Sequence, residues 1–163
     1  ASLSSDADYT DDLFTRALVT KEFEPHIARY ILFNIDLRQQ GEVRSARLDE
    51  VHVEHIYPQN PSIGWASFDS RNVPENHWKY NLGNQTLLDK KLNQAASNKT
   101  FEEKIQFYKR KNGDFGTGES EDGTVFNMTF ELHDAYQNGE DEWTTDRILA
   151  RAQNLAQQAT QIW

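Results

Sequence analysis

Apolar and polar residues alternate along residues 51–55, where Val51, Val53 and His55 are interleaved with His52 and Glu54. This period of two predicts a short strand, which Pro58 ends because proline cannot donate to a strand ladder. The apolar run at residues 85–88 predicts a second strand, and from residue 89 the spacing becomes helical. The expected order is therefore strand, long loop, strand and helix, over a core of about residues 48–99.

Helical patterns flank this core. Residues 11–40 predict two helices, the second with Pro25 near its first turn and Gly41 after its end. Thr100 and Glu103 form a capping box that opens a helix over residues 101–111. Apolar residues at steps of three and four predict a last helix over residues 144–162. The expected fold is α+β, predominantly helical, with the strand–strand–helix unit flanked by N- and C-terminal helices.

Composition limits the class of protein. The chain has 163 residues and is 37% hydrophobic, which is typical of a single globular domain. No stretch approaches the roughly 20 apolar residues of a membrane span, and no signal segment is evident at the start. The absence of cysteine excludes disulfides and thiolate metal sites, and favours a cytoplasmic location. The chain opens abruptly and ends on Trp163, so we expect it to be the C-terminal part of a longer protein.

Charge is unevenly distributed along the chain. The formal net charge is −9, which is unusual for a protein that binds DNA. Residues 71–111, however, contain nine Lys or Arg and four Asp or Glu, a balance of +5 against −14 elsewhere. This basic segment overlaps the predicted core, so the charge is compatible with a DNA site there.

Four polar residues of the core form a candidate site. Glu54 and His55 end the first strand, Asn84 precedes the second, and Asn93 lies on the helix. Hard cations such as Mg²⁺ prefer carboxylate and amide oxygens, and a neutral histidine can take a proton from an attacking water. The alternative is that these four residues only cap turns, as Asn84 after a glycine often does.

The motif EHIYP at residues 54–58, with Asn84 and Asn93 nine positions apart, resembles the ββα-metal nucleases of the HNH type. The sequence around this motif is similar to the C-terminal domain of GmrSD-type (type IV) restriction enzymes. The resembling stretches are EHIYPQN at 54–60, LGNQTLL at 82–88 and LNQAASNKTFEEK at 92–104. The resemblance implies cleavage of double-stranded DNA that carries modified bases, and an N-terminal nucleotide-sensing domain in the same protein.

The same resemblance implies roles for the four residues. His55 would be the general base, and Asn84 would orient the histidine or its loop. Asn93 and Glu54 would bind a divalent ion, Mg²⁺ or Mn²⁺. Glu54 departs from the usual aspartate of the superfamily because its side chain is longer, and the Cys-x-x-Cys zinc pairs of some HNH domains are absent.

Several residues around the motif are candidates for contacts with DNA phosphate. They are Lys91, Lys99, His77 and Lys79, of which the last two lie in the long loop before Asn84. Trp65, Phe68, Trp78 and Tyr80 are expected to anchor that loop by packing. The basic residues of the 101–111 helix, Lys104, Lys109, Arg110 and Lys111, are either a solvated face or phosphate contacts. His26 is expected to be a surface residue.

Three functions remain open from sequence. The first is a metal-dependent DNA endonuclease domain of a restriction or phage-defence system. The second is a catalytically silent DNA-binding or regulatory module that keeps the fold, and the third is a structural metal domain. A homodimer would suit an enzyme that makes paired cuts.

Overall fold

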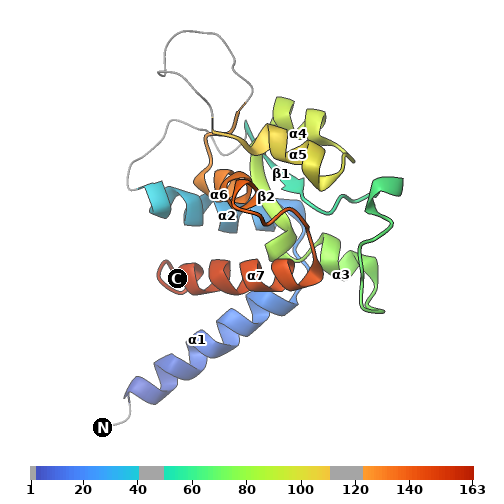
Figure 1. Cartoon of the computed structure of the whole chain (residues 1–163). Helices are drawn as coiled ribbons and strands as arrows, with labels where there is room; N and C mark the ends of the chain where they lie inside the picture. The colour runs from blue at the N-terminus through green and yellow to red at the C-terminus, as the bar shows by residue number, and fades with distance from the viewer. Residues whose placement is uncertain (1–2, 41–49, 111–122) are drawn as a thin grey trace.

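A two-stranded antiparallel hairpin lies at the centre of the fold (Figure 1). The structure, a computed structural model, describes residues 3–40, 50–110 and 123–163. Strand β1 (Val51–His55) pairs with β2 (Gln85–Asp89) so that His55 lies opposite Gln85. Helix α4 (Lys90–Ala96) follows directly, with the Asp89 side chain accepting a hydrogen bond from Leu92 N at its first turn. The predicted order of strand, loop, strand and helix is confirmed.

The loop between the strands is held by aromatic packing. It contains short turns of helix, which are η2 (Ile63–Trp65), α3 (Glu75–Lys79) and η3 (Leu82–Asn84). Trp65 and Trp78 are buried, and the ring of Phe68 stacks on Tyr57 with centroids 3.9 Å apart. The prediction that aromatic residues anchor this loop is therefore confirmed.

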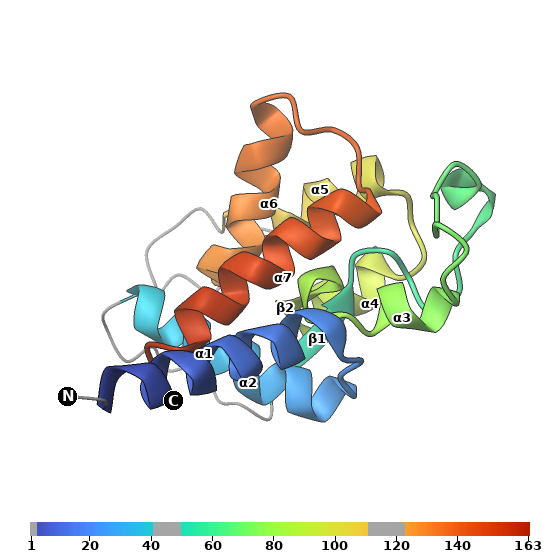
Figure 2. The same cartoon turned by 90° about the horizontal axis from the view of Figure 1, so that it is seen from below.

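Helices cover both faces of the hairpin. In Figure 1, α4 and α5 (Phe101–Tyr108) lie on one side of it, and α1 (Leu3–Thr20) and α7 (Thr145–Ala159) on the other. Helix α2 (Pro25–Gln40) contacts both strands, and α6 (Asn127–Gln137) contacts β2. Figure 2 shows α1 running alongside α7. The α+β, predominantly helical class is confirmed, and no described helix is long and apolar enough to cross a membrane.

Because helices lie on both faces, residues 85–88 of β2 are all buried. The hairpin separates two hydrophobic clusters. One contains Ile56, Leu88 and Ile105, and the other contains Val51, Leu87 and Leu155. The end of β1, which carries the candidate site, is thus held between two cores.

The helical flanks differ from the prediction at their ends. Helix α1 begins at Leu3 rather than residue 11, since a helix propagates easily once packing has nucleated it. Helix α5 ends at Tyr108 because the chain then turns to pair with residue 124, where Thr124 N donates to Lys109 O. The predicted end of this helix at residue 111 lies outside the described residues.

Candidate active site

His55, Glu54 and Asn93 lie on the wall of one surface pocket of about 300 Å³. Strand β1 and the residues that follow it supply one side. Asn93 of α4, with Ser97 and Asn98 just after the helix, supplies the other. Ser97, at the end of α4, has a left-handed backbone with φ 42° that turns the chain along the pocket. Three of the four predicted residues therefore share one site.

The His55 imidazole is buried and electrically neutral. Only 8% of the residue is exposed, and its Nε2 atom has no hydrogen-bond partner. Burial, and secondly the nearby charge of Lys104, lowers the pKa of His55 from 6.5 to about 4. The ring packs edge-on against Tyr80, with centroids 5.5 Å apart. At neutral pH the ring is uncharged, so one of its two nitrogens carries a lone pair.

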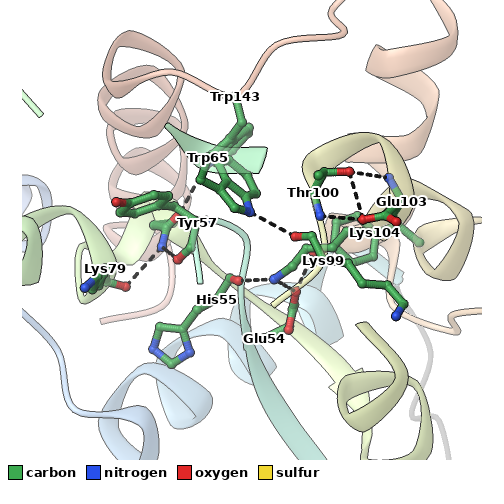
Figure 3. Close-up of polar contacts among 12 residues, drawn as sticks. Glu54, His55, Tyr57, Trp65, Lys79, Lys99, Thr100, Glu103, Lys104 and Trp143 are labelled. Atoms are coloured by element: carbon green, nitrogen blue, oxygen red, sulfur yellow. Dashed lines mark hydrogen bonds and ion pairs between the residues drawn. The ribbon is translucent and has the colours of Figure 1, made fainter. Parts of the chain in front are cut away.

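Glu54 does not face the pocket as a free carboxylate. Its Oε1 atom accepts a hydrogen bond from Lys104 Nζ at 2.6 Å and another from Tyr108 OH at 2.8 Å. Lys104 Nζ also donates to the carbonyl oxygen of His55 at 2.6 Å (Figure 3). In Figure 3 the His55 ring points away from this ion pair, as expected for consecutive strand residues.

Burial dominates the protonation of this ion pair. It raises the pKa of the Glu54 carboxyl, and the charge of Lys104 and the hydroxyl of Tyr108 oppose that rise. The same burial lowers the pKa of Lys104, whose charge Glu54 favours. The predicted metal ligand is thus already engaged by an ammonium group on one oxygen.

Lys104 was missed by the sequence analysis. It was expected to face solvent with the other basic residues, but it is fully buried. The sequence does contain a pattern that predicts this burial. Phe101, Lys104, Ile105 and Tyr108 recur at helical spacing, so they share one face of α5. A lysine at the centre of an apolar stripe needs an anionic partner, and Glu54 is the partner in this fold.

Asn84 acts on the backbone after His55. Its Oδ1 atom accepts from Tyr57 N at 2.8 Å and from Trp143 Nε1 at 2.9 Å. Its Nδ2 atom donates to the carbonyl oxygens of Tyr57 and Lys79. These four bonds saturate the amide, so Asn84 has no capacity left for substrate. Of the two predicted tasks, orienting the histidine or its loop, the contacts of Asn84 are those expected for the second, and its role in catalysis stays a prediction.

The candidate phosphate contacts lie outside the pocket wall. Lys91 and Lys99 are exposed, on α4 and just after it, so they flank the pocket residues of α4 in sequence. Lys79 forms an ion pair with Glu75 at 2.9 Å, and His77 packs against Trp78. Whether any of the four contacts DNA stays a prediction.

A larger pocket of about 430 Å³ lies by the long loop and the N-terminus of α7. Its charged lining is mainly acidic, with Asp69, Asp141, Glu142 and Asp146, and Arg71 is already paired with Asp146 at 2.7 Å. Such a surface repels phosphate, so it does not compete with the His55 pocket as a DNA site.

The family model for the C-terminal domain of the GmrSD restriction endonucleases matches residues 4–158. The chain belongs to this family. The GmrSD C-terminal domain match runs from the second residue of α1 to the last but one of α7 and includes all the candidate site residues. No curated protein and no solved structure shows a significant match to the chain.

Proposed function

We propose that this domain is a metal-dependent DNA endonuclease that hydrolyses phosphodiester bonds at the His55 pocket. The observation that carries the proposal is the meeting of His55, Glu54 and Asn93 at one pocket, in a chain of a restriction-endonuclease family. Double-stranded DNA is the proposed substrate. Its modified bases and a nucleotide-sensing N-terminal domain remain predictions of the resemblance. A homodimer remains a prediction from the needs of an enzyme that makes paired cuts.

His55 is the proposed general base. Its unpaired Nε2 atom accepts the proton of a water whose oxygen attacks phosphorus, while the bond from phosphorus to the leaving 3′ oxygen breaks. Asn84 holds the Tyr57 backbone and so fixes the segment after the base. Lys104 holds the His55 carbonyl from the other side.

The oxygen ligands of the pocket suit a hard cation that keeps some of its waters better than a cation coordinated by protein atoms alone. Asn93, Asn98 and Gln59 offer amide oxygens, and Glu54 offers a carboxylate that Lys104 partly neutralises. In the described residues no group of three His, Cys, Asp or Glu is placed to hold a metal. We therefore propose that Asn93 and Glu54 hold Mg²⁺ or Mn²⁺ together with a substrate phosphate. The ion would stabilise negative charge on the phosphate and the leaving oxygen.

A catalytically silent DNA-binding or regulatory module is the second candidate. The ion pair of Glu54 with Lys104 favours it, because an engaged carboxylate binds a cation less well. The unpaired Nε2 of His55 favours the endonuclease, because a silent domain has no need of a buried imidazole without a partner.

Plasmid cleavage against Mn²⁺ concentration tests the proposal. His55→Ala should lower the rate by about 10²–10⁴-fold at every Mn²⁺ concentration. Asn93→Ala should recover part of its loss at high Mn²⁺, because that variant weakens a ligand and leaves the base intact. Asn84→Ala should lie between the two, and His133→Ala on α6 is the matched histidine control. Circular dichroism monitors folding.

Two outcomes would reverse these assignments. Rescue of His55→Ala by Mn²⁺, with no rescue of Asn93→Ala, would exchange their roles. Cleavage by all variants at the parent rate would place the active site elsewhere. A parent that binds DNA and never cuts it would favour the silent module.

A further inference from the structure

A second pocket of about 260 Å³ adjoins the His55 pocket along β1. Pro25 and Val53 line both pockets, so the two are neighbours at the start of α2 and along β1. The remaining lining residues of the second pocket are His26, Arg29, Val51 and His52. None of its described lining residues is acidic, although the chain as a whole carries a net charge of −9.

Arg29 has a donor that the protein leaves unused. Its Nη1 atom donates a long hydrogen bond of 3.4 Å to the carbonyl oxygen of Val51. Its Nε atom is buried and has no hydrogen-bond partner. A buried donor without an acceptor is costly, and an anion in the pocket would supply the acceptor. A guanidinium suits a phosphate because it presents several N–H groups in a fixed plane.

The histidines and the helix add to this preference for an anion. His26 is exposed in the first turn of α2, and His52 is half-buried on β1. An imidazole donates at least one N–H bond whether or not it is protonated. Helix α2 has 16 residues and no acidic residue in its first turn, so the positive end of its dipole adds to the preference for an anion. Glu24 and Glu50 precede the two elements in sequence, but neither lines the pocket.

We propose that this second pocket binds a backbone phosphate of the DNA strand that is cut in the His55 pocket. The inference rests on the proposed function. The two pockets lie a few nucleotides apart at most, because His55 is three steps along the strand from His52, a span of roughly 10 Å. A nucleotide advances about 3.4 Å along a duplex. Arg29 carries the charge of the phosphate contact, and His26 and His52 orient it.

Binding of a fluorescein-labelled duplex in EDTA tests the proposal without cleavage. His26→Glu should weaken binding by about tenfold or more, because it places a carboxylate at the mouth of the pocket. Arg29→Gln should reduce the slope of log affinity against log salt by about one, the value for one lost phosphate contact. Both effects should be equal for two unrelated sequences, because phosphate carries no sequence information. Gln137→Glu, an exposed residue of α6, gives the matched added charge away from both pockets.

Each result either supports or overturns the proposal. An effect of His26→Glu no larger than that of Gln137→Glu overturns it, and so does a parent that does not bind the duplex. Stabilisation of the parent against heat by inorganic phosphate, lost in Arg29→Gln while DNA binding is unchanged, would assign the pocket to free phosphate instead. Because His26 is exposed, His26→Glu should keep the parent melting temperature.

The experiment separates this inference from the proposed function. If the pocket variants lose binding but the parent never cuts DNA with Mn²⁺, the phosphate subsite stands and the endonuclease proposal fails. If the parent cuts and the pocket variants bind and cut like it, the endonuclease proposal stands and the subsite fails.

Discussion

Glu54 and His55 are neighbours in sequence, but their side chains differ in whether they have polar partners. Glu54 is enclosed by α5 and neutralised by Lys104, whereas His55 keeps a ring nitrogen without a partner. Lys104 joins the two, because one ammonium contacts the carboxylate of Glu54 and the carbonyl of His55. The same ammonium that fixes the backbone of His55 also helps to keep its imidazole neutral.

This environment predicts that His55 makes the metal-free fold less stable in mild acid. The pKa of His55 is about 4 in the folded state and about 6.5 in the unfolded chain. The unfolded state therefore binds the proton first, and stability that is complete above about pH 7 is lost as pH falls from 6.5 towards 4. From pH 8 to pH 5, urea denaturation in EDTA should show the parent losing about 2 kcal/mol more than His55→Gln. Equal losses would mean that His55 is not buried as a neutral ring.

At the scale of elements, single residues connect the short helices, strands and turns around the site. Asn84 links η3 to the turn after β1 and to Trp143. Gly83 allows η3 to touch α7, since a Cβ there would lie 1.9 Å from the carbonyl oxygen of Ile148. The sequence predicted the two strands, α4 and the capping box of α5, because each has a local signal. These cross-links have no local signal, because each partner lies dozens of residues away.

Lys104 links α5 to β1, and its removal should lower the free energy of unfolding substantially. Lys104→Met leaves the buried Glu54 without its cation, which typically destabilises a fold by about 3–5 kcal/mol. Lys109→Met, an exposed neighbour of α5, should change stability by about 0.5 kcal/mol or less. Urea denaturation measures both variants.

The double variant Glu54→Gln/Lys104→Met provides the decisive comparison. It removes both charges, so it should be more stable than Lys104→Met alone. If the double variant were less stable than the single one, the two side chains would not form the ion pair described above.

At the scale of the whole molecule, fewer basic residues are free than the sequence indicated. Of the nine in residues 71–111, Lys104 is buried, and Arg71 and Lys79 are paired with carboxylates. Charge counted along a sequence does not reveal such pairing, because it depends on the fold. The exposed members around α4, Lys91 and Lys99, remain the candidates nearest in sequence to the pocket residues Asn93 and Asn98.

We expect DNA to bind on the face around α4, where Lys91 and Lys99 are exposed. Lys91→Glu/Lys99→Glu should weaken duplex binding by about tenfold or more and reduce the log–log salt slope by about two, since each lysine would contact one phosphate. Arg16→Glu/Lys21→Glu lowers the net charge by the same amount on and just after α1 and should have a smaller effect, because neither residue lines either pocket. Fluorescence anisotropy at several salt concentrations measures both pairs. If the two double variants lose affinity equally, overall charge governs binding, and the face around α4 has no special role.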